Sequence, residues 1–115
     1  MKIYNTLTAL EEEFISQKKN EVNMYVCGIT PYDEVHLGHG RCYVVFDVLR
    51  RYLEYKGYNV NYIQNFTDID DKILNKSKEL NLEPKEVAEK YINIYFEVEK
   101  KLNIKQAKFY PKVTE

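Results

Sequence analysis

The order of a strand, a long helix and a second strand between Val22 and Phe66 constrains the fold most. The apolar run over residues 22–29 is rich in β-branched side chains and ends at Thr30-Pro31, which is typical of a strand in a parallel sheet covered on both faces. Apolar residues then recur at helical spacing over residues 37–56, and residues 59–66 alternate polar and apolar side chains. Such a βαβ unit has a right-handed crossover and binds ligands beyond the carboxyl ends of its strands. The sequence therefore predicts an α/β fold with a parallel core.

The predicted long helix has two distinct faces. We expect its apolar stripe to face the core, and this stripe consists of Val44, Val45, Val48, Leu49, Tyr52 and Leu53. Arg50, Arg51 and Glu54 take the other face. The first turns, residues 42–46, are apolar nearly all round, so we expect this end, including Cys42, to be deeply buried. Gly57 occupies the position of a C-terminal cap.

The segments around this unit are less regular. Residues 11–21 are polar and charged, which predicts an exposed loop. Two more helices are expected, one over residues 69–80 and one from Pro84 onward, because Pro suits the first helical position. The second should present its charged residues to solvent and pack through the side formed by Val87, Tyr91, Ile94, Tyr95, Val98 and Leu102. Residues 108–115 match no regular element.

Composition excludes several classes of protein. The 17 Lys and Arg residues against 18 Asp and Glu residues give a formal net charge of -1, which does not suit a basic nucleic-acid clamp. No apolar run is long enough to span a bilayer, and residues 1–6 lack the apolar core of a secretory signal. Cys27 and Cys42 are too few for a disulfide scaffold. We therefore expect a cytoplasmic protein with no membrane partner.

The string His36-Leu37-Gly38-His39 lies between the first predicted strand and the long helix. A helix N-terminus offers free N–H groups and a partial positive charge, and both attract phosphate. Gly38 allows a phosphate or a flat ring to approach the backbone, and two imidazoles can donate hydrogen bonds to phosphate oxygens. Nucleotidyl transfer depends mainly on such positioning. Short strings of this kind also arise by chance. The interpretation as a phosphate site therefore depends on the strand before the string and the helix after it.

Two longer blocks resemble those of cysteinyl-tRNA synthetases, which are class I enzymes. Residues 24–41, Met-Tyr-Val-Cys-Gly-Ile-Thr-Pro-Tyr-Asp-Glu-Val-His-Leu-Gly-His-Gly-Arg, are similar to the family signature, with Leu37 for the usual Ile. Residues 65–73, Asn-Phe-Thr-Asp-Ile-Asp-Asp-Lys-Ile, resemble a second block at the right distance, and residues 4–8 also fit. The resemblance covers essentially the whole chain. It implies the first half of a Rossmann-like class I synthetase catalytic domain, a parallel βαβ core with additional helices.

The resemblance also implies a reaction and a nucleotide site. The full-length protein would activate cysteine with Mg-ATP and transfer it to the tRNA for cysteine. His36 and His39 would be the catalytic residues and would bind the ATP phosphates. Gly38 would make room for the adenine, and Tyr32 and Asp33 would help to line the nucleotide pocket.

For the substrate cysteine, the resemblance implies contacts with Cys27, Gly28 and Thr67. Cys27 would act through zinc as one thiolate ligand, whereas outside the family it would be read as a buried apolar residue at a strand end. Catalytic zinc sites use three protein ligands, so the remaining ligands (a Cys, a His and often a Glu) are expected outside this chain. A thiolate binds zinc far better than a hydroxyl does, so zinc would select cysteine over serine.

Alternatives remain for the residues after the second strand. Thr67 suits an N-cap of the next helix as well as it suits a substrate contact. Asp68, Asp70 and Asp71 could form a Mg²⁺ site or an acid–base pair, but we favour charge complementarity at the start of the helix.

Three rival functions stay open beside the ligase. A ligase that joins cysteine to a small amine shares these motifs, a plain nucleotidyltransferase would need neither Cys27 nor the block around Thr67, and a non-catalytic module would need no later ligands. We expect the chain to be inactive alone and the full-length protein to be a monomer. We divide the chain into a core over about residues 1–80 and the helical start of a connecting insertion over about residues 81–115.

Overall fold

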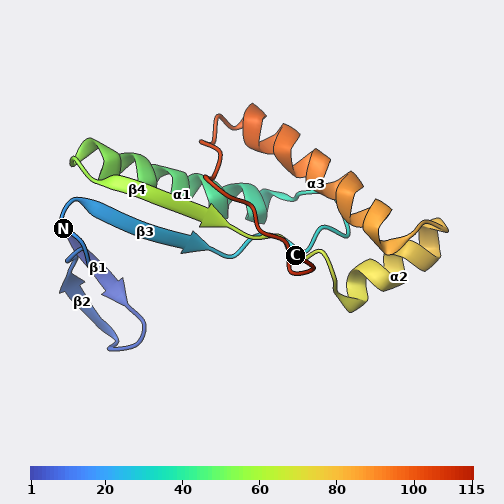
Figure 1. Cartoon of the computed structure of the whole chain (residues 1–115), viewed down its shortest axis with the longest axis horizontal. Coiled ribbons are helices and arrows are strands. Elements are labelled where there is room, and N and C mark those ends of the chain that lie inside the picture. The colour runs from blue at the N-terminus through green and yellow to red at the C-terminus, as the bar shows by residue number, and fades with distance from the viewer.

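The computed structural model describes residues 1–115 and has a parallel strand pair at its centre. Strand β3 (Glu21–Val26) lies beside β4 (Asn59–Gln64), with Glu21 opposite Asn59 and Val26 opposite Gln64. Helix α1 (Leu37–Tyr55) connects them and lies along the pair in Figure 1. The predicted βαβ unit is thus confirmed, although β3 ends before residue 29. Gly57 follows the helix with a φ of 90°, as expected of a residue after a C-terminal cap.

The N-terminal segment forms a hairpin that the sequence did not predict. Strands β1 (Lys2–Asn5) and β2 (Leu10–Glu13) pair in antiparallel fashion, so the prediction of a loop is wrong for residues 11–13. Consecutive glutamates are poor strand formers, but here they have partners. Asn5 Nδ2 donates to Glu12 at 3.0 Å, and the N-terminal ammonium lies 3.1 Å from Glu13.

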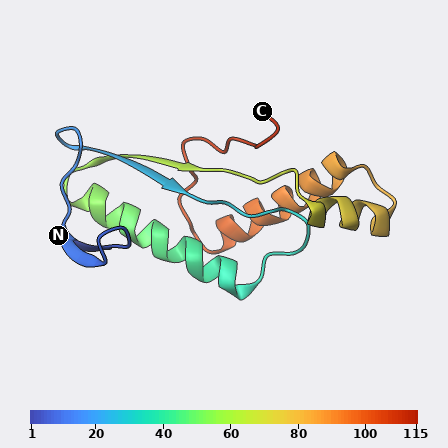
Figure 2. The ribbon, with the colours of Figure 1, turned by 90° about the horizontal axis from the view of Figure 1, so that it is seen from below.

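Helices cover one face of the β3–β4 pair. Figure 2 shows α1 and α3 (Pro84–Lys101) on the same side of the strands, and the strand side chains buried on that side are Val22, Val26, Val60, Tyr62 and Gln64. On the other face, Tyr25 is 60% exposed. The expectation of cover on both faces is therefore wrong within these residues, because α2 (Asp71–Leu80) lies beyond the strand ends beside α3 (Figure 1).

Helix α1 turns a different stripe to the core than its apolar pattern predicts. Leu53 is buried as expected, but Val45 and Val48 are 57% and 61% exposed. The buried residues of the helix are Tyr43, Asp47, Arg50 and Leu53. Cys42 is also exposed, so its assignment to the core is wrong, and so is the deep burial of the first turns.

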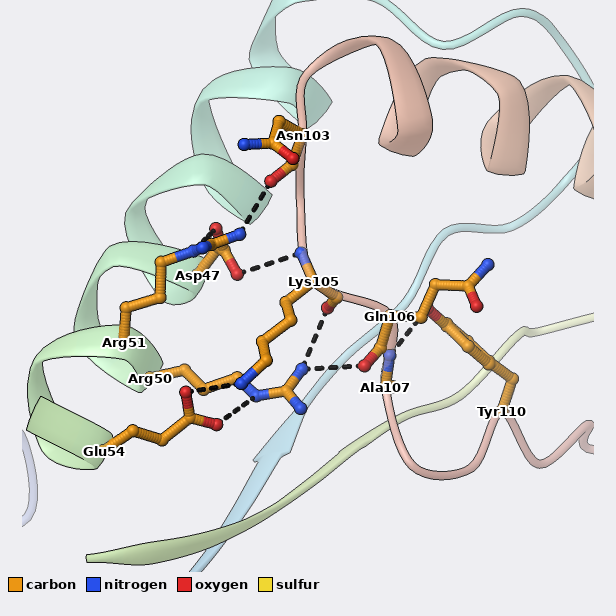
Figure 3. Close-up of polar contacts among 9 residues, drawn as sticks. All are labelled: Asp47, Arg50, Arg51, Glu54, Asn103, Lys105, Gln106, Ala107 and Tyr110. Carbon is orange, nitrogen blue, oxygen red and sulfur yellow. Dashed lines mark hydrogen bonds and ion pairs between the residues drawn. The ribbon is translucent and has the colours of Figure 1, made fainter. Parts of the chain in front are cut away.

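Charged residues can face inward on α1 because a distant segment satisfies them. Arg50 Nη1 donates to the carbonyl oxygens of Lys105 and Gln106 at 2.9 and 2.8 Å. Its Nε lies 3.3 Å from Glu54 Oε1, and Asp47 Oδ1 accepts from the Lys105 N–H at 3.1 Å. Figure 3 shows these contacts, which we call the α1 clasp, holding the segment after α3 against α1. Local periodicity cannot reveal a partner that lies 55 residues away.

The clasp should contribute strongly to stability. We expect Arg50→Ala to lower the free energy of unfolding by about 2–4 kcal/mol, because it removes the charge-assisted hydrogen bonds that a buried guanidinium makes to two carbonyl oxygens and to Glu54. Lys105 Nζ, at 2.6 Å, then remains as the partner of Glu54. Urea unfolding followed by circular dichroism measures this change. Lys85→Ala is the control, since it removes an exposed 4.0 Å contact with Glu89 and should cost less than about 1 kcal/mol. Equal losses in the two variants would contradict a stabilising clasp.

The start of α3 matches expectation, and its buried side only partly does. Pro84 is the first residue of the helix, as predicted. Tyr91 and Tyr95 are buried as expected, whereas Leu102 is 45% exposed and Glu99 is 2% exposed. The Glu99 carboxylate accepts from the Tyr110 hydroxyl at 2.8 Å, and burial raises its pKa. The prediction that the charged residues of this helix are all solvated is therefore wrong at Glu99.

Residues 108–113 lie alongside β4 and the residues just after it, but they form no regular strand. Single parallel bridges join Ile63 to Phe109 and Phe66 to Lys112. The sequence predicted no regular element here, and none forms. The two bridges nevertheless hold the segment beside Ile63 and Phe66. None of the three helices has an apolar stretch of the length needed to cross a bilayer.

Candidate functional site

The predicted site residues gather at one edge of the sheet. Residues 27–36 lead from the carboxyl end of β3 to the N-terminus of α1, and residues 65–70 lead from the carboxyl end of β4 to α2. Figure 1 shows both connections leaving the same end of the strand pair. The location agrees with the rule that ligands bind beyond the carboxyl ends of parallel strands.

The two histidines form the N-terminal cap of α1. His36 Nδ1 accepts from the Gly38 N–H at 3.1 Å, and His39 Nδ1 accepts from the His36 N–H at a longer 3.4 Å. Their rings are stacked, with centroids 3.7 Å apart. Partial burial, and then the nearness of His36, lowers the pKa of His39.

This cap sets the chemistry that the rings can offer. A neutral imidazole that accepts at Nδ1 carries its proton on Nε2. His36 and His39 can therefore each present an Nε2–H donor at the N-terminus of a helix, where the free N–H groups of the first turn also attract anions. The arrangement suits a phosphate group.

Gly38 makes the closed cap possible. A Cβ added at this position would lie 2.9 Å from His36 Cε1 and 3.0 Å from its Nδ1. A larger residue would push the His36 ring away from the helix. This contact gives Gly38 a role within the protein, beside the room for adenine that the resemblance implies.

Tyr32 and Asp33 lie on the loop that leads to His36. Tyr32 is half-buried, and Lys72 Nζ lies 5.2 Å from the centre of its ring. Tyr32 packs against a buried cluster between α2 and α3 that consists of Ile73, Val87, Ala88 and Tyr91. Asp33 is exposed and its Oδ1 accepts from the Glu34 N–H at 2.8 Å. The roles of both residues in binding nucleotide stay predictions.

The Cys27 thiol is exposed, so the alternative of a buried apolar residue is wrong. Its peptide bond to Gly28 is held from two sides. The Tyr43 hydroxyl donates to the Cys27 carbonyl oxygen at 3.2 Å, and the Gly28 N–H donates to Asn65 Oδ1 at 2.8 Å. The sequence had assigned no role to Tyr43 or Asn65. The available signals were the position of Tyr43 one helical turn after His39 and the place of Asn65 at the end of a predicted strand.

Thr67 joins the same pair of loops but does not cap α2. Its N–H donates to the Ile29 carbonyl oxygen at 3.1 Å. The N-cap of α2 is Asp70, whose Oδ1 accepts from the Lys72 N–H at 2.9 Å, so the helix begins later than predicted. The capping role proposed for Thr67 is wrong, and its contact with the substrate stays a prediction.

The acidic residues of this edge serve local structure. Asp70 is the cap, Asp71 lies in the first turn of α2, and Asp68 Oδ1 accepts from the Thr114 N–H at 3.2 Å. No group of three or more His, Cys, Asp or Glu side chains is placed to hold a metal ion. Cys27 can serve as a single ligand, and a single thiolate cannot hold zinc.

Most of the chain matches one family of proteins. Residues 13–115 match the model of the tRNA synthetases class I (C) catalytic domain. The chain belongs to this family. Cysteine–tRNA ligase of Methanococcus vannielii is 56% identical over 115 residues, which cover 100% of this chain and 24% of that protein. The corresponding protein of Endomicrobium trichonymphae is 57% identical over the same 100%, at 25% of its own length.

The chain thus spans about a quarter of the length of these relatives. The cysteine–tRNA ligase of Clostridioides difficile gives the same result, with 54% identity over 100% of this chain and 25% of that protein.

A solved structure supports the fold. Mycobacterium tuberculosis methionyl-tRNA synthetase in complex with methionyl-adenylate superposes with a TM-score of 0.72 over 81% of this chain and 18% of that chain, at 18% identity. Together with the family match, this confirms the predicted α/β fold of a class I synthetase catalytic domain, of which the chain carries a part.

Proposed function

We propose that the full-length protein is a cysteine–tRNA ligase, which activates cysteine with Mg-ATP and transfers it to the tRNA for cysteine. The observation that carries the proposal is the similarity along the whole chain, at 54–57% identity, to proteins of that name. The geometry supports it, because the histidine cap and the loops bearing Cys27 and Thr67 meet at one edge of the sheet. Family membership also disfavours a plain nucleotidyltransferase.

The phosphate half of the site lies at the start of α1. In adenylation, a carboxylate oxygen of cysteine attacks the α-phosphorus of ATP and pyrophosphate leaves, so no protein nucleophile is needed. The Nε2–H groups of His36 and His39 would donate to phosphate oxygens as negative charge builds up on them. Gly38 keeps the His36 ring in its capping position, and Tyr32 and Asp33 would line the nucleotide pocket.

The cysteine half lies at the ends of β3 and β4. Cys27 is exposed with a free thiol, so it could serve as one zinc ligand. The other ligands would come from the rest of the full-length protein. When bound, zinc would lower the pKa of the substrate thiol and bind it as a thiolate. Gly28 and Thr67 would contact the rest of the substrate.

The proposal extends to the end of the chain and to the state of the full-length protein. Residues from about 81 to 115 would begin a helical insertion that connects the two halves of the catalytic domain. The full-length protein would act as a monomer in the cytoplasm.

Charging of tRNA tests the proposal. Full-length protein is incubated with ATP, labelled cysteine and a transcript of the tRNA for cysteine, and the label in acid-precipitable RNA is measured. We expect RNA to be labelled. Label in a conjugate with a small amine would instead support the amine-joining ligase, and no cysteine activation at all would support a non-catalytic module.

The isolated 115-residue chain should not activate cysteine. It supplies one zinc ligand where a catalytic site needs three, so we expect its cysteine-dependent exchange of pyrophosphate into ATP to equal the background without cysteine. Robust exchange by this chain would show that the division of the active site is wrong.

A further inference from the structure

We propose that Asn65 and Tyr43 are positioning residues of the cysteine site, because together they fix the peptide bond that follows Cys27. This inference rests on the proposed function, in which Cys27 is a zinc ligand. Neither residue would touch zinc or substrate. Each would act by holding the backbone that carries the thiol.

The peptide between Cys27 and Gly28 has two polar atoms, and each is bound by a side chain. Its carbonyl oxygen accepts from the Tyr43 hydroxyl of α1 at 3.2 Å, and its N–H donates to Asn65 Oδ1 at 2.8 Å. A peptide unit is planar, and its C=O and N–H point in opposite directions within the plane, so a hydrogen bond to each restricts its rotation. Because this plane includes the Cα atom of Cys27, it also limits the directions in which the thiol can point.

The side chains take over where the sheet ends. The paired register of β3 and β4 stops at Val26 and Gln64. The peptide between Cys27 and Gly28 therefore lies beyond the hydrogen-bonded ladder of the two strands. Asn65 supplies the missing acceptor from its side chain. Tyr43 is 4% exposed and its ring meets Tyr95 edge-on at 5.4 Å, which keeps its hydroxyl directed at Cys27.

Gly28 shows how closely the two loops approach. A Cβ added to Gly28 would lie 1.5 Å from the Asn65 carbonyl oxygen, a distance that no side chain can tolerate. The backbones of residues 28 and 65 are therefore in direct contact. In a close, part-buried contact of this kind, a shift of Asn65 also shifts the backbone next to Cys27.

The partners of a metal ligand matter because they hold it in the geometry that the metal requires. Replacing such outer partners typically weakens metal binding or activity by about 10–100-fold. The nucleotide half should be unaffected, since His36 and His39 are held by their own cap. The expected signature is thus a loss confined to zinc and cysteine.

The experiment uses full-length protein with Asn65→Ala, Asn65→Asp and Tyr43→Phe. Zinc affinity is measured by competition with a chromogenic chelator, and the KM values for cysteine and ATP are measured by pyrophosphate exchange. Asn61→Ala is the matched control, because Asn61 Nδ2 donates to Asn23 Oδ1 at 3.1 Å and so bridges the same two strands away from the site.

We expect Asn65→Ala to weaken zinc binding and to raise the KM for cysteine by about 10-fold or more, with the KM for ATP within about twofold of wild type. Asn65→Asp retains an acceptor oxygen, so its zinc affinity and its KM for cysteine should lie close to those of wild type. Tyr43→Phe keeps the ring but lacks the hydroxyl, so it should also weaken zinc binding and raise the KM for cysteine. If Asn65→Ala misfolds, Tyr43→Phe still tests the inference, because it removes only the hydroxyl that donates to the Cys27 carbonyl oxygen.

The inference would be overturned if Asn65→Ala and Tyr43→Phe had the same zinc affinity and the same KM for cysteine as Asn61→Ala. An equal rise in both KM values, which indicates general damage, would also overturn it. A wild-type protein that binds no zinc and activates no cysteine would instead overturn the proposed function, so the two failures are distinguishable.

Discussion

Replacing His39 by Ala in the full-length protein is expected to slow cysteine-dependent pyrophosphate exchange by about 100-fold or more. The variant loses an Nε2–H donor aimed at phosphate, and loss of one such donor to a developing charge has an effect of this size. It also loses the acceptor for the His36 N–H, so the cap should loosen. Exchange rates at saturating cysteine and ATP measure the effect.

His39→Asn provides the control for this prediction, because its amide retains an N–H donor on a shorter side chain. It should recover part of the lost rate. A rate in His39→Ala within about threefold of wild type would remove His39 from the phosphate site, since a donor to the reacting phosphate cannot be lost at so small a cost.

The pKa of His39 adds a pH dependence to the same contact. Folding lowers this pKa below its ordinary value of 6.5, so the folded state favours the neutral ring. The stabilising contribution is therefore present above pH 6.5 and is lost as the pH falls through the lowered pKa of the folded state. Acid should weaken the cap, because a protonated His39 Nδ1 no longer accepts from the His36 N–H.

Replacing Cys27 by Ala is expected to reduce the zinc affinity of the full-length protein by more than about 100-fold, since loss of a ligand should exceed the loss of an outer partner. Discrimination between cysteine and serine should fall with it, because pocket shape alone separates such similar side chains poorly. Metal content after dialysis and exchange rates with each amino acid measure the two effects.

Cys42→Ala is the matched control for this variant. Cys42 is the other cysteine of the chain and is also an exposed free thiol, but it lies on α1 and not at the end of β3. It should keep full zinc content and selectivity. Full zinc occupancy in Cys27→Ala would contradict the assignment of Cys27 as a ligand.

Local patterns predicted the elements of the fold well. The run around Val26, the helical spacing after Leu37 and the alternation after Asn59 all depend on side chains that contact near neighbours. Each element formed, although both strands end earlier than predicted. Pro84 marked the start of α3 for a similarly local reason. The hairpin was missed because the glutamates of β2 are poor strand formers whose pairing partner lies at the N-terminus.

Contacts between distant segments could not be read from local patterns. Apolar spacing placed Val48 in the core and Arg50 outside, whereas the clasp reverses both, because the carbonyl oxygens of Lys105 and Gln106 satisfy the guanidinium. The same limit applied to the candidate site. His36 and His39 lie only three residues apart in one motif, but the hydrogen bond from Gly28 to Asn65 spans 37 residues.

Amino acid-dependent exchange of labelled pyrophosphate into ATP, measured with the wild-type full-length protein, is the decisive test of a zinc-dependent cysteine ligase. We expect exchange with cysteine, little exchange with serine or methionine, loss of exchange when a chelator removes zinc, and recovery when zinc is restored. Exchange that proceeds equally well with serine, or that is indifferent to zinc removal, would contradict this expectation.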